Sequence, residues 1–425
     1  MRRAIRSPWL LTCALLAACA GGGDDGGATG SGGQGASSSG GSGGSSTTSS
    51  AGGADGGAGG SLGPPSVSRI GDTFEIPSLA ESTPKRFVDA AYDPVHDGYL
   101  VVNGNSAISA SFISADGAPL GSPAKVDQTA AWAQGVRVAY GAAAQGFLVA
   151  WHDARNDPNS ASAFGRIVRW DGASIAFAGS DFALSQNPSY QEAAPAIAYA
   201  PGSDQFLVAW QQTAGSDIHA RFVSAQGTLL GQELAITADP DWQSDVAIAY
   251  NPGQDEMLVS YTYAGATTEV RVQRVGTDGS LRGSPVTLTQ AGGTWLTQSA
   301  YLPSTGGYLV AWYEGALRAV QLGPDGAPLG APFALAPGYG AYDGFSVAMA
   351  PASERFMAVM HGQTDEDFAA AFDASGEQSA VVQATDSPGT DGHFNPHVVA
   401  HPTRPEWLLV TSLGYHSVVG QRLGP

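Results

Sequence analysis

The chain has 425 residues, 58 of them glycine, and its 38 acidic side chains against 19 lysines and arginines give a net charge of −19 at pH 7. So large a negative charge disfavours nucleic acid and anionic lipid surfaces as partners, because their phosphate groups would be repelled. The two cysteines, Cys13 and Cys19, both lie near the N-terminus, so the rest of the chain has no thiol and no disulfide.

Residues 1–18 have the pattern of a secretory signal. The segment MRRAIR places three arginines before the apolar run Pro8–Ala18, as in the charged and apolar regions of signal peptides. A membrane-spanning helix takes about 20 apolar residues, and neither this run nor any later one reaches that length. We therefore expect export and no transmembrane helix.

The end of that run, Leu16-Ala17-Ala18-Cys19, resembles the lipobox of bacterial lipoproteins at all four positions. The resemblance implies diacylglycerol on the Cys19 sulfur, cleavage before Cys19, and acylation of the new amino group. Several acyl chains would make the bilayer a lasting partner, and Ala20 in place of aspartate favours the outer membrane over the inner. The alternative is an ordinary cleaved signal with an incidental cysteine.

Residues 19–65 read as the lipidated cysteine and a tether. This segment is almost wholly glycine, serine, alanine and threonine, and its charges are Asp24, Asp25 and Asp55. It has too little apolar surface to offset the entropy of ordering, so it is predicted to be disordered. A flexible chain of this length spans about 35–40 Å, enough to lift a domain away from lipid headgroups.

From residue 66 to 425 one pattern recurs seven times. A small residue, alanine and tyrosine precede a turn, and an aromatic residue followed by Leu-Val-x-Trp comes after it, as in IAYAPGSDQFLVAW from Ile197. The equivalent positions, called here the repeat aromatics, lie 48 to 59 residues apart: Tyr92, Tyr140, Tyr199, Tyr250, Tyr301, Met349 and Ala400. A fixed period of this length is typical of propellers and other repeat folds.

Each copy contains four short strand-like runs and no helical periodicity, which predicts an all-β fold, a seven-bladed β-propeller. The seventh copy ends at VVGQRLGP after its third strand, while Gly71–Ile76 fits the fourth-strand pattern. We therefore expect the N-terminal strand to complete the last blade and close the ring, which removes an exposed edge. The alternative is a β-sandwich with irregular repeats.

The segment FLVAWHDAR, Phe147 to Arg155, resembles the Leu-Val-x-Trp-x-Asp-x-Arg repeat of large secreted bacterial propellers, although only the second copy keeps Asp153 and Arg155. The resemblance implies that the large second-strand rings fill the wedge between blades: Trp151, Trp210, Tyr261 and Trp312. The marks of integrin-type calcium-binding blades, of sialidases and of WD40 blades are absent. The likeness therefore concerns the fold and not a function.

An aromatic residue, beside amides or carboxylates, lies six to nine residues before the repeat aromatic in six of the seven copies. In propellers these loops meet on one face around the central channel. Rings flanked by oriented polar groups suit sugars or peptide side chains. The predicted ligand-binding face comprises Trp132, Gln134, Tyr190, Glu192, Trp242, Asp245, Trp295, Gln298, Tyr342, Asp343 and Phe394. The alternative is that these rings are also wedged between blades.

No catalytic, cofactor or metal site is predicted. His393, His397 and His401 are four residues apart, which in an extended strand is a step of about 13 Å, too long for ligands of one zinc ion. The acidic loops around Asp239 and Asp365 lack a calcium-binding spacing and are interpreted as solvated. We interpret the histidines as polar residues of a degenerate seventh repeat.

Two functions remain open. The first is a monomeric, envelope-anchored, non-catalytic binding or scaffold module for a glycan, peptide or protein. The alternative is a polysaccharide hydrolase or lyase with its active site at the channel mouth, which would need a convergent acid–base pair.

Overall fold

The repeats fold into seven antiparallel sheets of four strands each, in the part of the chain that the computed structural model describes. The described residues are 64–80, 85, 87–104, 106–128, 133–155, 161–186, 195–212, 216–290, 292–339, 344–351, 353–362, 366–386, 393–414 and 416–425. Their regular elements are all β-strands, and no helix among them is long and apolar enough to span a bilayer. The predicted signal, Cys19 and residues 19–63 lie outside this description.

Each sheet is one blade, numbered in chain order from the inner strand outwards. Blade 1 contains β2 (Phe87–Asp93), β3 (Gly98–Gly104), β4 (Ile108–Ser114) and β5 (Pro119–Lys125). Blade 2 contains β6 (Ala133–Gly141), β7 (Gly146–Asp153), β8 (Ser162–Trp170) and β9 (Ile175–Ala183). Blade 3 contains β10 (Ala196–Ala200), β11 (Gln205–Gln211), β12 (Ile218–Ser224) and β13 (Leu229–Ala235).

Blades 4 to 7 follow the same order. Blade 4 contains β14 (Trp242–Asn251), β15 (Glu256–Ala264), β16 (Thr268–Gly276) and β17 (Leu281–Thr289), and blade 5 contains β18 (Trp295–Leu302), β19 (Gly307–Tyr313), β20 (Leu317–Leu322) and β21 (Phe333–Ala334). Blade 6 contains β22 (Phe345–Ala350), β23 (Arg355–His361), β24 (Asp367–Phe372) and β25 (Val382–Gln383). Blade 7 contains β26 (His393–Ala400), β27 (Trp407–Leu413), β28 (Ser417–Gly424) and β1 (Ser68–Ile76).

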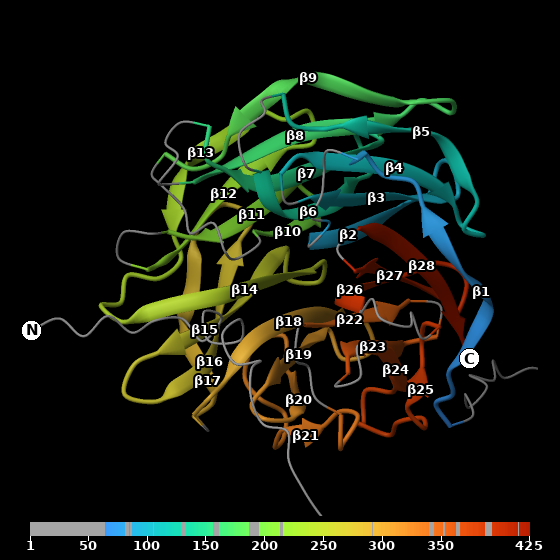
Figure 1. The fold of residues 1–425 in the computed structure, drawn as a ribbon. Helices are drawn as coiled ribbons and strands as arrows, with labels where there is room; N and C mark the ends of the chain where they lie inside the picture. Colours follow the sequence, from blue (N-terminus) through green and yellow to red (C-terminus); the bar gives the residue numbers. More distant parts are fainter. Residues whose placement is uncertain are drawn as a thin grey trace, which may run out of the picture. The chain divides into compact units, whose positions relative to one another are not determined.

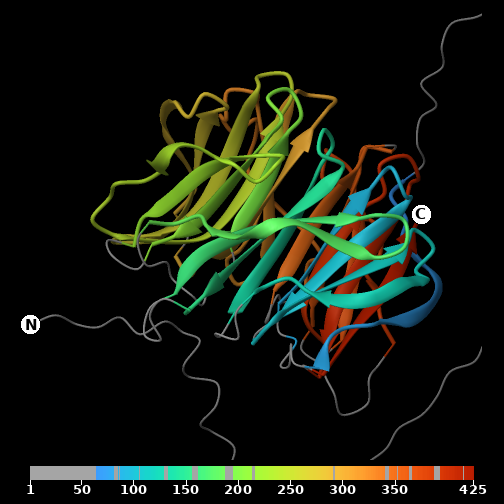
Figure 2. The ribbon, with the colours of Figure 1, turned by 90° about the horizontal axis from the view of Figure 1, so that it is seen from above.

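The seven inner strands form a closed ring. Each of β2, β6, β10, β14, β18, β22 and β26 contacts the next one, and β26 contacts β2. Figures 1 and 2 show the strands of each blade side by side, with the blades following one another in chain order. The predicted seven-bladed β-propeller is confirmed.

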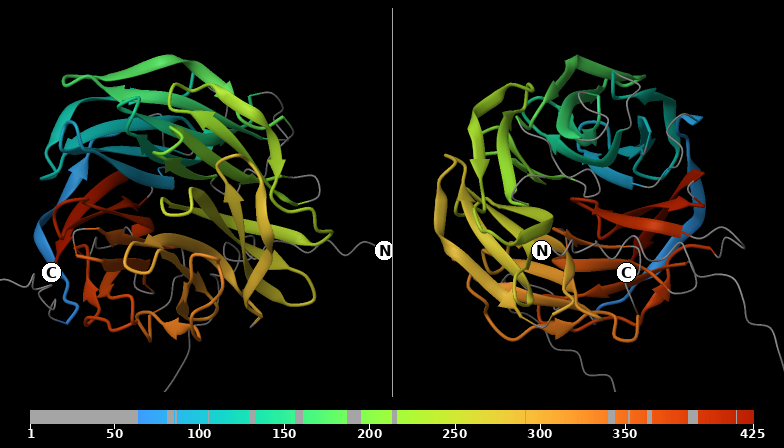
Figure 3. Two further views of the ribbon diagram at one scale, coloured as in Figure 1. Left: turned by 180° about the vertical axis from the view of Figure 1, so that it is seen from behind. Right: turned by 60° about the vertical axis from the view of Figure 1, so that its left-hand side comes forward.

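The ring is closed by the N-terminal strand, as predicted. β1 pairs antiparallel with β28, from Ser68 opposite Gly424 to Ile76 opposite Val418. Figure 3 shows β1 beside the C-terminal strands in both views. Blade 7 therefore contains both ends of the described chain, and its outer strand comes from a segment that precedes blade 1.

The apolar core consists of seven layers, and each layer lies between two neighbouring blades. Trp151, Trp210, Tyr261 and Trp312 are 0–1% exposed and belong to four different layers. Their predicted role as fillers between blades is confirmed. The layer between blades 7 and 1 contains Ile76 of β1, so the closing strand also contributes to the packing.

The repeat tyrosine fixes the turn between the first two strands. In six blades the residue five positions after the repeat aromatic has a positive φ of 45–65°: Asp97, Gln145, Asp204, Asp255, Gly306 and Glu354. The hydroxyl groups of Tyr92, Tyr199 and Tyr250 donate to the aspartates at this position over 2.6–2.9 Å. A side-chain hydrogen bond thus holds a backbone conformation that L-residues rarely adopt.

Candidate functional site

The inner strands begin at one side of the ring, called here the rim, and most of them are bent there. In five blades the residue five positions before the repeat aromatic has a positive φ: Gly135, Asp245, Leu296, Gly344 and Asn395. In four of them the pairing register shifts at this point. Such bulges re-aim side chains and are common beside binding sites. The bulges were not predicted, although Gly, Asp and Asn at one repeat position were a usable signal.

Two of the predicted rim aromatics lie at the starts of neighbouring blades. Trp242 is the first residue of β14 and is 41% exposed. Trp295 is the first residue of β18, is half-buried, and has its ring centroid 5.6 Å from that of Tyr313. Since β14 and β18 contact each other, blades 4 and 5 together form an aromatic part of the rim.

The other predicted residues are distributed differently. Gln134 is buried near the start of β6, whereas Asp245 and Gln298 are half-buried in β14 and β18. Phe394 lies in β26, but its side chain is outside the described residues, as are Trp132, Tyr190, Glu192, Tyr342 and Asp343. For all of the predicted residues the binding role stays a prediction.

Polar groups close to Trp242 in the sequence are held by side chains of β15 and β16. The Tyr263 hydroxyl donates to Asp241 over 2.5 Å, and this bond, helped by burial, raises the pKa of Tyr263 to about 12. The Arg271 guanidinium lies 3.4 Å from the Tyr263 ring centroid and 3.3 Å from Asp239. Fixed carboxylates and an exposed ring thus occur at the same end of blade 4, and both kinds of group suit a polyhydroxylated ligand.

Asp245 lies at the bulge of β14 and accepts a hydrogen bond of 2.9 Å from Ser244. Burial raises the pKa of this carboxyl group, against the lowering effect of its hydrogen bonds. Its side chain nevertheless keeps partial contact with solvent. The carboxyl group is therefore half-buried near the start of an inner strand.

The residue three positions before the repeat aromatic reaches the inner strand of the next blade. Asp89 accepts from the backbone N–H of Val138 over 2.9 Å, and Ser346 accepts from that of Val398 over 3.2 Å. These side chains satisfy N–H groups on the inner edge of each sheet, which has no further strand to pair with. In these two blades the repeat position therefore lies at the inner edge of the ring, and the repeat predicts the same placement for its equivalents in the other blades.

Two histidines of blade 7 contact two different carboxylates of blade 1. His397 Nδ1 lies 2.8 Å from Asp89 Oδ1, and His401 Nε2 lies 3.1 Å from Asp97. Among the described residues no group of three histidines and carboxylates is placed to hold a metal ion. The two described histidines of the regular spacing join the last blade to the first.

Asp153 and Arg155, which carry the resemblance to secreted propellers, tie strands together. The Trp151 indole donates to Asp153 over 3.2 Å, and Arg155 Nη1 lies 2.9 Å from Asp181 on β9. Blade 5 has a related arrangement, in which Trp312 donates to Glu314 over 2.9 Å. These side chains therefore stabilise the blade, and the candidate ligand-binding residues lie elsewhere.

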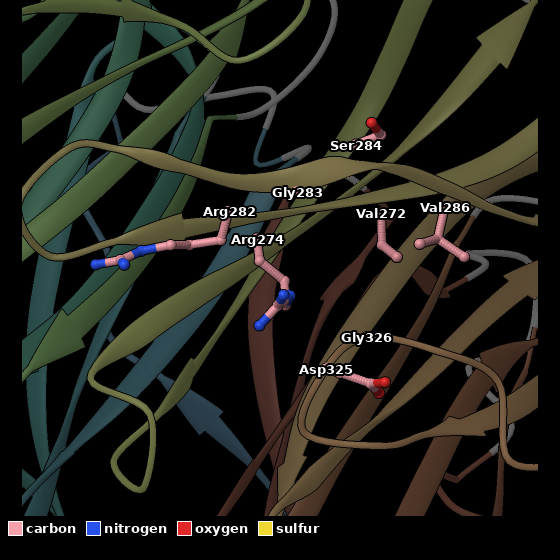
Figure 4. Close-up of a pocket in the computed structure, with 8 residues that line it drawn as sticks. All are labelled: Val272, Arg274, Arg282, Gly283, Ser284, Val286, Asp325 and Gly326. Atoms are coloured by element: carbon pink, nitrogen blue, oxygen red, sulfur yellow. The ribbon is translucent and has the colours of Figure 1, made fainter.

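A small hollow of about 120 Å³ lies between blades 4 and 5, away from the inner strands. Its lining includes Arg274, Arg282 and Asp325, and Figure 4 shows the Arg282 side chain extending away from the Asp325 turn. Arg274 is held by Glu256 at 3.2 Å. The hollow is therefore part of the contact between the two blades.

Comparison with known proteins shows the fold alone. No family model matches the chain, and no curated protein matches its sequence. The structure is similar to the crystal structure of Chaetomium thermophilum Raptor, with a TM-score of 0.56 and 11% sequence identity. The match covers 85% of this chain and 29% of that chain.

Proposed function

We propose that the protein is an envelope lipoprotein whose propeller is a non-catalytic binding module for a glycan. The propeller fold fits a binding or scaffold module. The lipobox at Leu16–Cys19 supports anchoring through Cys19. The tether would then hold the propeller away from the outer membrane, where its rim can meet a ligand.

The observation that carries glycan binding is the exposed ring of Trp242 at the end of blade 4 that also holds two fixed carboxylates. A large aromatic face open to water supplies stacking, and Asp239 and Asp241, held by Arg271 and Tyr263, supply oriented acceptors for hydroxyl groups. A peptide or protein would also use the ring. Acceptors aimed at hydroxyl groups favour a sugar.

Trp242→Ala tests this proposal on a glycan array and by calorimetry with the retained glycans. We expect binding to weaken about tenfold to a hundredfold, as hot-spot rings contribute about 1–3 kcal/mol. Leu281→Ala is the matched control, because Leu281 is 47% exposed on β17 of the same blade. Unchanged glycan retention by the Trp242 variant, at an unchanged melting temperature, would refute the binding role.

A polysaccharide hydrolase or lyase is the second candidate, and the Asp89–His397 pair favours it, since a carboxylate can orient a histidine for proton transfer. Such an enzyme needs two proton-transfer groups at one point. Asp245, the carboxyl group with the raised pKa, belongs to blade 4, across the ring from blades 7 and 1. Release of sugar fragments from a bound glycan, abolished by His397→Asn, would establish the enzyme instead.

A further inference from the structure

The repeat position that borders the channel is charged on one side of the ring only. In blade order from 1 to 7 the residues are Asp89, Arg137, Ala196, Ala247, Gln298, Ser346 and His397. The three charged or titratable groups belong to the consecutive blades 7, 1 and 2, and the next two blades carry alanine. At this level of the ring the charged side chains therefore lie on one side, followed by a stretch of small side chains.

Asp89 is occupied by the protein itself. Its carboxylate accepts from the N–H groups of Ala90 and Val138, over 2.7 and 2.9 Å, and contacts His397. Burial opposes its charge, but His397, Arg137 and the Val138 N–H together hold the pKa of Asp89 below its ordinary value. The carboxylate is thus charged and fully engaged.

Arg137 is engaged far less. Among the described residues its guanidinium has one hydrogen-bond partner, the Val136 carbonyl at 2.9 Å from Nη1, and no carboxylate lies within ion-pair distance. Arg155, Arg271 and Arg274 each contact a carboxylate within 3.3 Å. Burial lowers the pKa of Arg137, and the side chain keeps partial solvent access. A half-buried guanidinium with unused donors therefore lies near Asp89, and the next two blades carry alanine at the same repeat position.

We propose that Arg137 binds a single carboxylate of the ligand, so that the ligand is an otherwise neutral glycan carrying a uronic acid. This inference rests on the proposed glycan binding. The planar fork of arginine matches a carboxylate with two parallel hydrogen bonds. A polyanion or a doubly charged phosphate is disfavoured, because Asp89 lies beside the site and the net charge is −19.

The rim and this site are separated both along the strands and across the ring. Trp242 lies eight positions before its repeat aromatic and Arg137 three before its own, so the two levels differ by about 17 Å along the strand direction, and the two residues belong to blades 4 and 2. An oligosaccharide of several sugar units that stacks on Trp242 would span this separation and place its acidic end at the level of Arg137.

The test uses oligosaccharides in pairs, each ending in one uronic acid or in the same sugar with its carboxyl group reduced to the alcohol. We expect the wild-type protein to bind the acidic member at least tenfold more tightly, and Arg137→Gln to bind both members alike. Arg169→Gln is the matched control, because Arg169 also donates to a backbone carbonyl, that of Ala144 at 3.2 Å. Arg137→Lys keeps the charge but lacks the planar guanidinium, so it should lose most of the preference for the acidic oligosaccharide. This variant provides the test if Arg137→Gln does not fold.

The outcomes separate the two proposals. Equal binding of both members by the wild-type protein, or a preference that survives in Arg137→Gln, overturns the carboxylate site while glycan binding stands. Tighter binding of a polyuronate than of the singly charged oligosaccharide overturns the restriction to one carboxylate. Binding of neither member of any pair overturns glycan binding and this inference together.

Discussion

In most blades a single residue in the turn after the first strand has a backbone conformation that L-residues rarely adopt. The turn after the first strand needs a positive φ, and blades 1, 3 and 4 meet that need with an aspartate held by the repeat tyrosine. Blade 5 meets it with Gly306 at φ 65°, where nothing lies within 4 Å of an added Cβ. The positive φ of this turn is therefore achieved in two ways in the same chain, by an aspartate that the repeat tyrosine holds or by a glycine.

Gly306→Ala isolates the backbone cost, because a methyl group there meets open space. We expect the free energy of unfolding to fall by about 1–2 kcal/mol, the cost of the left-handed conformation for an L-residue. Gly330→Ala is the control, since Gly330 also has nothing within 4 Å and does not have a positive φ. Urea unfolding measures both, and equal effects of the two substitutions would contradict the argument.

Asp245→Asn tests the titration of the channel wall. The unfolded carboxyl group titrates near pH 3.9, and the folded one titrates higher because burial disfavours its charge. The wild-type protein therefore loses stability as the pH rises through this window. Asparagine does not ionise and tolerates the positive φ of 52°. We expect the variant to be more stable than wild type at pH 7.

Unfolding by urea at pH 7 and at pH 3 measures this difference, which should vanish at pH 3. Asp278→Asn is a contrasting control, because hydrogen bonds from Ser280 lower the pKa of that exposed carboxyl group. Its substitution should have the opposite sign at pH 7. A less stable Asp245 variant at pH 7 would show that its hydrogen bonds matter more than its burial.

At the scale of strands, the seam between blades 7 and 1 joins distant parts of the chain. Ile76 of β1 packs in the apolar layer with Val88 and Leu408. Polar contacts add to it, since His397 pairs with Asp89 and Arg404 Nη2 lies 2.7 Å from Asp97. An open seam would expose this layer, so closure couples the stability of all blades.

Deleting Gly71 to Pro77 should therefore destabilise the whole propeller. The deletion removes the pairing of β1 with β28 and the burial of Phe74 and Ile76, and each such side chain contributes about 1.5–3 kcal/mol. A loss of more than about 3 kcal/mol in the free energy of unfolding is expected. Removing seven residues within Ser38–Ser50 is the matched control and should change nothing. Equal and negligible effects would exclude closure by this strand.

The blades and their closure could be predicted because their signals are local: alternation, turn residues and a period of about 50 residues recur in order. The weak outer strands of blades 5 and 6 escaped prediction. β21 and β25 have two residues each, and Pro328 and Pro332, which cannot donate to a ladder, flank the blade 5 segment. A fourth-strand pattern in the sequence did not ensure a full strand.

The channel site escaped prediction for a different reason. Arg137, Asp89 and His397 come from three blades, and no spacing along the chain marks them as neighbours. Their shared position, three before the repeat aromatic, is visible in the sequence. That the side chain at this position points toward the next blade follows only from the arrangement of the blades in the ring, which the sequence does not show. The exposed Trp242 was predicted because the rim position is aromatic in most repeats.

At the scale of the whole molecule, the proposed function needs an anchor as well as a fold. The net charge of −19 lies on the propeller, since three arginines of the signal offset three aspartates of the tether. Such a charge would keep the propeller off anionic headgroups. Attachment to the membrane would then depend on the acylated Cys19 alone, and the tether sets the distance.

Cys19→Ser tests this dependence, because the thioether needs the sulfur and the processing step needs the thioether. We expect a slower-migrating precursor to accumulate, metabolic labelling with a fatty acid to give no signal on the protein, and the outer-membrane fraction to lose it. Cys13→Ser is the matched control, since Cys13 lies inside the predicted signal and would be removed with it. That variant should be processed, labelled and anchored like wild type. Because the acyl chains are the proposed anchor, normal maturation and membrane attachment of the Cys19 variant would overturn the proposal that the propeller is anchored through Cys19.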